Sequence, residues 1–249
     1  MTATAGGASI AHGELTRSGN LIVSLQGTIE PRSLPRDRLA PVKVHIKGSV
    51  KTVDGSQPPV LRQLAVAINS HGKIFSRGLP ICTTRQLQQR NTEAALAACR
   101  GALVGHGTFD ASVAFPNLVP FPAHGAVLVF NGRHAGHQAI IFHIFGSNPV
   151  QITFVLPLTV ERRHGGKYGT TLSAKFPRIA SDLGYVTGVD FTMGRRYLYK
   201  GKMRSFLSAS CAAPEGFTVA TFPFVKGTFG FSSGQSIDTS LIRNCQVRG

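Results

Sequence analysis

Apolar residues alternate with small or polar ones along much of this amino-acid sequence, and this period of two limits the chain mainly to β-strands. In a run that ends at Cys82, the side chains of Leu64, Val66 and Ile68 fall on one side of an extended backbone. Residues 69–72, Asn-Ser-His-Gly, supply a turn before the chain returns. The pattern predicts a hairpin with one buried face, followed by a cysteine.

The same design returns over residues 184–211. Val189, Phe191 and Met193 alternate, Gly194 marks a turn, two tyrosines alternate on the way back, and a cysteine again ends the run. Shorter alternating runs separated by Gly or Pro recur through the rest of the chain. Many short strands with such breaks are typical of an antiparallel β-sandwich. We therefore predict an all-β fold.

One segment has a helical pattern instead. Residues 92–98 combine high helix propensity with a capping residue at Asn91 or Thr92, and Gly101 is a suitable stop. Thr83 and Thr84 can cap a shorter first turn. The sequence thus predicts one short helical excursion, at about residues 84–99, within the β-rich chain.

The two hairpin-then-cysteine runs suggest two similar sandwich units. Residues 1–20, which are small, polar and without periodicity, are predicted to be a flexible lead. The first unit then covers 21–131 with the helical insertion, and the second covers 138–249. The alternative is a single β domain over 21–249.

The four cysteines are Cys82, Cys99, Cys211 and Cys245, and no two form a C-x-x-C motif. Four cysteines permit three connectivities, and the hypothesis that we carry forward is local pairing, Cys82 with Cys99 and Cys211 with Cys245. Disulfides would indicate an exported protein, extracellular or at the cell surface. Four free thiols would indicate a cytoplasmic one.

The first ten residues lack the basic start and long apolar run of a secretory signal. Either a signal has been removed or lost, or the protein stays inside the cell. No apolar stretch approaches about 20 residues without a polar break, so no transmembrane segment is predicted.

Charge is strongly unbalanced: 27 Lys and Arg face 11 Asp and Glu, which gives a formal net charge of +16. A cationic surface attracts polyanions such as nucleic acid, anionic lipid head groups or acidic cell-wall polymers. The basic residues are scattered, however, and a genome that favours arginine explains them equally well. Charge alone therefore gives a class of partner and no particular one.

Residues 195–204 are the strongest binding candidate, because basic and aromatic side chains are interleaved there. On a hairpin, Arg196, Leu198 and Lys200 would lie on one face and the residues between them on the other. The candidate binding residues are Arg195, Arg196, Tyr197, Tyr199, Lys200, Lys202 and Arg204. The alternative is an edge hairpin that charge protects against aggregation.

Catalytic and metal-binding patterns are weak. His134 and His137 share a loop, but a third metal ligand is not evident, since no Asp or Glu lies between Asp110 and Glu161. Five acids at turns or strand ends single out no glycosidase pair: Asp54, Asp110, Asp182, Asp190 and Glu215. The G-x-S-x-G and phosphate-loop motifs are absent. We predict no metal and no cofactor, and identify no catalytic residue.

Four segments resemble an uncharacterised family of exported, β-rich actinobacterial proteins: 33–42 (SLPRDRLAPV), 77–82 (RGLPIC), 99–105 (CRGALVG) and 205–211 (SFLSASC). The resemblance covers most of the chain from about residue 17 onward. It implies export through a cleaved signal peptide, and it carries no activity or site residue with it.

The first functional hypothesis is an exported, non-enzymatic β-sandwich protein whose cationic surface contacts an anionic cell-envelope or matrix polymer. A secreted carbohydrate-active or other hydrolase on the same scaffold is the first alternative. A nucleic-acid-binding protein is the second. A deep pocket with converging acids or histidines would favour the enzyme, and a continuous basic face would favour a binder.

Overall fold

The computed structural model describes residues 14–115, 117–148, 151–176 and 184–248, and it confirms the all-β prediction. Fourteen strands form one sheet, and two smaller sheets lie at one end of it. The strands of the large sheet are β1 (Glu14–Ser18), β2 (Leu21–Glu30), β3 (Ser33–Leu34), β5 (Lys43–Thr52), β6 (Leu61–Asn69), β8 (Cys82–Thr83), β9 (Leu103–Val113), β10 (Phe121–His134), β11 (His137–Asn148), β12 (Ile152–Arg162), β13 (Tyr168–Lys175), β14 (Gly184–Met193), β18 (Val219–Phe231) and β19 (Ser236–Val247).

The order across the large sheet is β1-β2-β5-β14-β9-β10-β11-β12-β13-β6-β18-β19-β3, with β8 added beside β10. Neighbours are antiparallel except for the short parallel pairs β8–β10 and β3–β19. Strand β6 lies between β13 and β18, and β14 lies between β5 and β9. Strands from the ranges 21–131 and 138–249 therefore share one hydrogen-bonded sheet.

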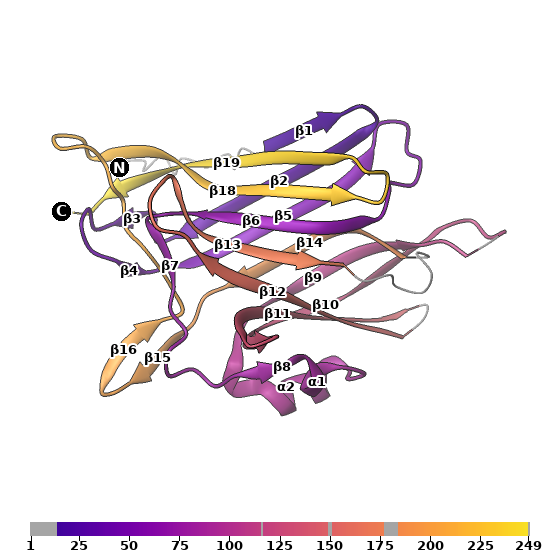
Figure 1. Cartoon of the computed structure of the whole chain (residues 1–249), viewed down its shortest axis with the longest axis horizontal. Helices are drawn as coiled ribbons and strands as arrows, with labels where there is room; N and C mark the ends of the chain where they lie inside the picture. The colour runs from indigo at the N-terminus through magenta and orange to yellow at the C-terminus, as the bar shows by residue number, and fades with distance from the viewer. Residues whose placement is uncertain (1–13, 116, 149–150, 177–183, 249) are drawn as a thin grey trace, which may run out of the picture.

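The sheet curls until its two ends approach each other, with β1 and β2 near β19 (Figure 1). Side chains join the two ends: Gln235 Nε2 donates to the Ser18 carbonyl oxygen at 2.8 Å, and Arg243 Nε donates to the Gly27 carbonyl oxygen at 2.6 Å. The opposed walls of the predicted sandwich thus belong to one curled sheet. Strong right-handed twist makes such curling the ordinary outcome for many-stranded sheets.

The period of two seen in the sequence sorts side chains between the inside and the outside of this curl. Along β2, Leu21, Val23, Leu25, Gly27 and Ile29 are buried, and the residues that alternate with them are half-buried. The flexible lead predicted for residues 1–20 is too long, because Glu14–Ser18 form β1 and pair with β2. Residues 1–13 lie outside the described residues.

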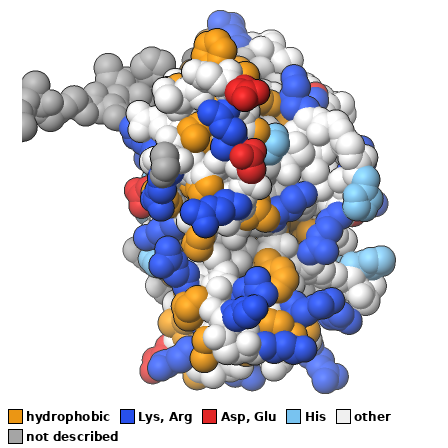
Figure 2. Space-filling view, turned by 90° about the vertical axis from the view of Figure 1, so that its left-hand side faces the viewer, with side chains coloured by type: hydrophobic (Ala, Val, Ile, Leu, Met, Phe, Trp, Pro, Cys, Tyr) orange, Lys and Arg blue, Asp and Glu red, His pale blue; other side chains and the backbone are white. Residues whose placement is uncertain are grey.

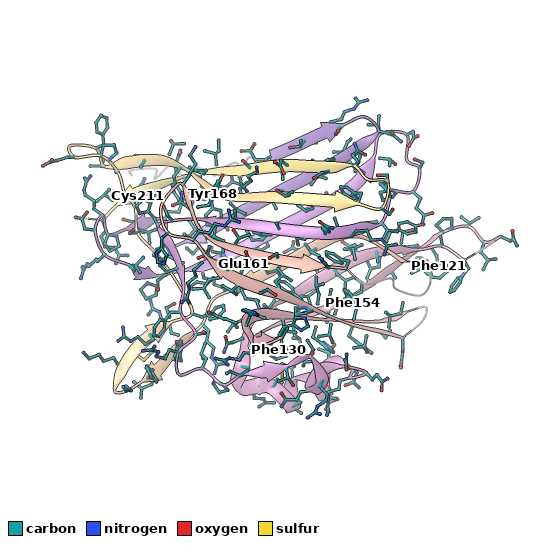
Figure 3. The ribbon with its side chains drawn as sticks, in the orientation of Figure 1. Phe121, Phe130, Phe154, Glu161, Tyr168 and Cys211 are labelled. Atoms are coloured by element: carbon teal, nitrogen blue, oxygen red, sulfur yellow. A yellow bond between two sulfur atoms is a disulfide. The ribbon has the colours of Figure 1, made fainter. Side chains whose placement is uncertain are left out.

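The helical excursion is confirmed, as α1 (Thr84–Leu87) and α2 (Thr92–Cys99), followed by a 3-10 turn at Arg100–Ala102. Its caps are as predicted: the Thr83 hydroxyl accepts from the Gln86 amide, and the Asn91 side-chain oxygen accepts from the Ala94 amide at 2.8 Å. The helices cover the outer face of β10 and β11, where Phe130 is fully buried (Figure 3).

Local cysteine pairing is also confirmed. Cys82 is bonded to Cys99, which ties α2 to β8. Cys211 is bonded to Cys245, which ties the segment that follows β17 (Leu207–Ala209) to β19. Strand β8 approaches β10 at Gly132, where a Cβ atom would lie 2.6 Å from the Cys82 carbonyl oxygen. Glycine at this position lets the bonded cysteine reach the sheet.

Two small sheets cover the end of the curl that lies at the left of Figure 1. One contains β4 (Ala40–Pro41), β17 (Leu207–Ala209) and β7 (Gly72–Ile74) in that order. The other is a two-stranded hairpin of β15 (Arg196–Tyr199) and β16 (Lys202–Ser205), which projects from the body of the molecule (Figure 1). The strongest binding candidate of the sequence is thus on a protruding element.

Candidate functional site

The β15–β16 hairpin turns at Lys200 and Gly201, whose φ angles are 50° and 70°. Positive φ at both central residues is the two-residue turn that best matches the twist of paired strands. The predicted alternation is confirmed: Arg196 and Leu198 are exposed, Tyr197 is buried, and Tyr199 is half-buried. The hairpin thus has an inner and an outer face.

The inner face anchors the hairpin. The Tyr197 hydroxyl donates to the carbonyl oxygens of Phe75 and Arg77, at 3.2 and 3.0 Å. Burial raises the pKa of this hydroxyl, so it remains a donor. The Tyr199 ring covers Gly78 so closely that a Cβ atom there would lie 2.1 Å from it.

Arg195 is also an anchor, because its Nη1 donates to the carbonyl oxygens of Gly101 and Leu103, at 2.7 and 2.8 Å. Arg195, Tyr197 and Tyr199, three of the seven predicted binding residues, therefore anchor the hairpin to the rest of the protein. The sequence showed no sign of this division. The glycine under Tyr199 and the carbonyl oxygens around Arg195 come from distant parts of the chain.

The hairpin exposes four cations around an apolar pair. Arg196, Lys200, Lys202 and Arg204 are all exposed, although Lys202 and Arg204 pair with Tyr199 and Tyr197 and so lie on the inner face. Between them Leu198 and Met203 face each other across the hairpin and are 68% and 65% exposed. The prediction for residues 195–204 rested on basic and aromatic side chains, so it did not include this apolar pair, although both residues lie inside the segment.

The hairpin cations have no acidic partner among the described residues, where ion pairs use Asp110, Asp190 and Asp238. Arg204 instead lies over the Phe75 ring, 5.6 Å from its centroid. Figure 2 shows that Lys and Arg side chains spread over this whole side of the molecule, with few acidic side chains between them. The hairpin is thus the protruding part of a wider basic face.

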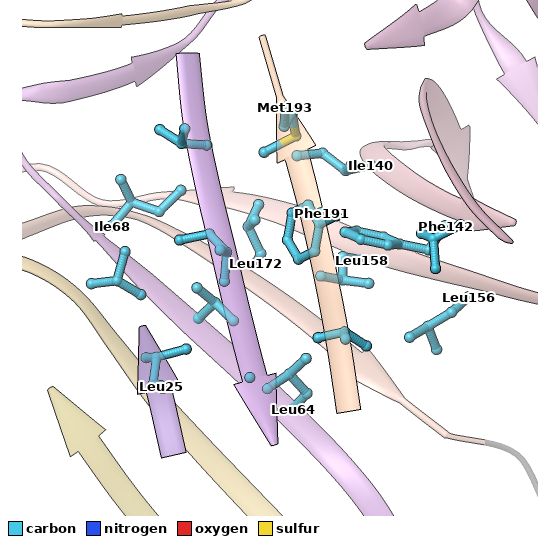
Figure 4. A pocket seen from close by; sticks show the side chains of 18 of the residues that line it. Leu25, Leu64, Ile68, Ile140, Phe142, Leu156, Leu158, Leu172, Phe191 and Met193 are labelled. Carbon is cyan, nitrogen blue, oxygen red and sulfur yellow. The ribbon is translucent and has the colours of Figure 1, made fainter. Parts of the chain in front are cut away.

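A second candidate site is an internal cavity of about 220 Å³ between the walls of the curled sheet. Figure 4 shows apolar side chains converging on it from opposite walls, including Leu25, Ile68, Ile140, Phe142 and Phe191. An apolar space of this size is larger than the voids that protein interiors normally contain.

Inward-facing residues of three central strands border this space and retain partial exposure. They are Val44 and Ile46 on β5, Leu64, Val66 and Ile68 on β6, and Val189 and Phe191 on β14. Four lining positions are glycine: Gly48, Gly72, Gly188 and Gly227. At Gly48 an added Cβ atom would meet its nearest neighbour, Val189 Cγ2, at an ordinary 3.6 Å, so the wall there has room.

The histidine side chains that the structure describes do not converge on one site. His134 and His137 pair at the exposed tip of the β10–β11 hairpin, and His124 Nδ1 lies 2.5 Å from Asp110 Oδ1. His143 is fully buried beside the helices, and its Nε2 donates to the Arg90 carbonyl oxygen at 2.9 Å. Among residues 14–248, apart from the gaps given above, no three His, Cys, Asp or Glu side chains cluster as metal ligands.

The acids singled out in the sequence are likewise separate. Asp110 faces His124, and Asp190 Oδ1 lies 2.5 Å from His45 Nε2 on the outside of the sheet. Asp54 accepts from the Ser56 amide in a turn, and Glu215 is exposed near the second disulfide. Asp182 lies outside the described residues. The acids that can be placed do not face each other across a cleft.

Fold and sites together define a class: an all-β protein with two disulfides, a protruding cationic hairpin and an internal apolar cavity. No family model, curated protein or solved structure matches the chain. In the described ranges, no helix is long and apolar enough to cross a membrane. The resemblance to exported actinobacterial proteins therefore remains an expectation from the sequence.

Proposed function

We propose that the protein is exported, has no catalytic activity, and contacts an anionic cell-envelope or matrix polymer through the exposed cations of the β15–β16 hairpin. The observation that carries this proposal is the protruding hairpin with four exposed cations, Arg196, Lys200, Lys202 and Arg204. No acid of the described chain forms an ion pair with them.

A repeating anionic polymer suits this arrangement better than a single small anion. Exposed cations spread over a hairpin each gain little from one counter-ion, but a polymer presents several charges at once. The surrounding basic face adds long-range attraction that falls as salt rises. The anchored inner face keeps the four cations in place, because Tyr197 and Arg195 fix the strand that bears Arg196.

Two disulfides support the export part of the proposal, since disulfides persist mainly in oxidising compartments. The separated acids and histidines support the non-enzymatic part. Asp110 and Asp190 each face a histidine on the outside of the sheet. A hydrolase would instead bring such groups together in a pocket.

The test is binding to polygalacturonate, an acidic polysaccharide, with the hairpin variant Lys200→Gln with Lys202→Gln. The matched control is Lys51→Gln with Lys175→Gln, which removes the same charge from exposed positions on β5 and β13. We expect the hairpin variant to bind about tenfold more weakly at low salt and the control to lose much less.

Equal losses in the two variants would show that net charge, and not the hairpin, drives binding. Tighter binding of double-stranded DNA than of polygalacturonate at the same salt would favour the nucleic-acid alternative. Either result would overturn the proposal.

A further inference from the structure

We infer that the cavity inside the curled sheet is a binding site for an apolar chain, such as the hydrocarbon chain of a fatty acid or lipid. This site faces inward, whereas the proposed polymer contact uses the exposed cations of the β15–β16 hairpin. The two assignments therefore stand on different residues and can fail separately.

The shape of the cavity favours a chain over a compact ring. Its lining follows β5 along every second residue from Val44 to Val50, and follows β6 in the same way from Leu64 to Ile68. The six residue-to-residue steps from Val44 to Val50 extend about 20 Å at the rise of a strand. A volume of about 220 Å³ spread over that length is narrow, and one extended hydrocarbon chain fits it.

The chemistry of the lining favours an uncharged, apolar occupant. The wall residues that converge in Figure 4 are Leu, Ile, Phe and Met, and the one charged residue on the lining is Lys73. Lys73 lies at the end of the cavity that β7 and β17 cover, and it is exposed to solvent. A polar group in the middle of the cavity would find no hydrogen-bond partner, so recognition depends on length and width.

The energetics point the same way. Tight packing normally leaves few voids larger than a water molecule inside a protein. Apolar cavities of about 150 Å³ remain dry and take up molecules the size of benzene. Here half-buried Val66, Ile68 and Phe191 border the space in the middle of a large sheet. A hydrocarbon chain would restore the contacts that these side chains lack.

The first experiment titrates the protein with N-phenyl-1-naphthylamine, an uncharged dye whose fluorescence rises in apolar surroundings. Because the dye has no charge, the basic surface does not attract it. The test variant is Val66→Phe, which fills the cavity between Leu172 and Gly227. The matched control is Ala65→Phe, the neighbouring position, which points to the outside of the same strand.

We expect saturable binding of one dye per protein, at least tenfold weaker binding to Val66→Phe, and unchanged binding to Ala65→Phe. Gly48→Val fills the cavity from the opposite wall and is a second test if Val66→Phe does not fold. The melting temperature of each variant shows that it is folded. Dye binding that does not saturate, or that both filled variants retain in full, overturns the inference.

Displacement of the dye by competing ligands then identifies the source of the hydrocarbon chain. Palmitic acid that displaces the dye indicates a free fatty acid, and phosphatidylglycerol vesicles that displace it indicate a lipid chain taken from a bilayer. If neither displaces the dye, the assignment to a hydrocarbon chain is wrong. The variant Lys200→Gln with Lys202→Gln is expected to bind the dye normally, which separates this inference from the proposed polymer contact.

Discussion

Several arginine side chains of this protein tie distant parts of the backbone together, and Arg36 and Arg195 are two of them. Arg36 donates to the carbonyl oxygens of Ala213, Pro214 and Phe217, and so holds the turn that follows Cys211. Arg195 holds the chain around Gly101 in the same manner. A guanidinium group has five donors in a rigid plane, which suits it to bind several carbonyl oxygens at once.

Arg195→Lys should therefore lower the free energy of unfolding by about 1–2 kcal/mol, because an ammonium group cannot reproduce the paired contacts to Gly101 and Leu103. Urea denaturation measures the loss. Arg196→Lys, at the exposed neighbouring position, is the control and should stay within about 0.5 kcal/mol of the wild type. Similar losses in the two variants would contradict the role of Arg195 as a tie.

His143 gives a prediction for pH. Burial lowers the pKa of this imidazole from its ordinary 6.5 in the folded state, and the hydrogen bond to Arg90 only partly opposes that effect. Below pH 6.5 the unfolded chain therefore binds a proton that the folded protein resists. The stability that neutral His143 contributes is present above that pH and is lost as the pH falls toward the lowered pKa.

We expect the free energy of unfolding to decrease from pH 7.5 to pH 5, and to decrease less in His143→Gln. Urea denaturation at several pH values measures both slopes. The difference between the two slopes isolates the contribution of His143, because the rest of the chain is the same in both proteins. Parallel slopes would show that His143 is not the source of the dependence.

Among the elements, the helical excursion is the one most dependent on a covalent link. Its two helices are short, and helices of this length are not stable alone. The Cys82–Cys99 bond closes a segment with a separation of 17 residues and holds α2 against β10 and β11. Without the bond, the helices are held by the packing of Leu87 and Ala95 and by the hydrogen bonds of His143 and Thr153 to the Arg90 carbonyl oxygen.

The double variant Cys82→Ser with Cys99→Ser should lower the free energy of unfolding by about 3 kcal/mol. Hydrogen exchange in α2 should increase under conditions in which the large sheet is still closed. The hydrogen-exchange pattern decides the result, because uniform acceleration would mean that the helices do not open separately. Thiol titration of the denatured wild type without reductant should find no free cysteine.

The β15–β16 hairpin shows which structural features of an element can be predicted from its own sequence pattern. Alternation correctly separates Arg196 and Leu198 from the two tyrosines, because side-chain direction in a strand is a local property. The anchoring of Tyr199 depends on Gly78, and that of Arg195 on Gly101, which are distant in the chain. Local periodicity contains no information about such partners.

For the whole molecule, the sequence predicts the class of fold and the pairing of the cysteines, but not the order of strands. The insertion of β14 between β5 and β9 depends on pairings across some 80 to 140 residues of chain. The cavity is beyond prediction for a similar reason. Alternation shows that Val66 and Phe191 face inward, but the distance between opposed walls depends on the curl of the sheet.

The side-chain seam between β19 and the first two strands has a mechanical consequence. A cylinder of strands joined all round by backbone ladders has a circumference set by its register. Here, in the described chain, the bonds across the seam come from Gln235, Arg243 and Glu14, whose flexible side chains tolerate small changes in spacing. The circumference of the curled sheet can therefore adjust to a thicker or thinner bound hydrocarbon chain while the backbone hydrogen bonds between neighbouring strands stay intact.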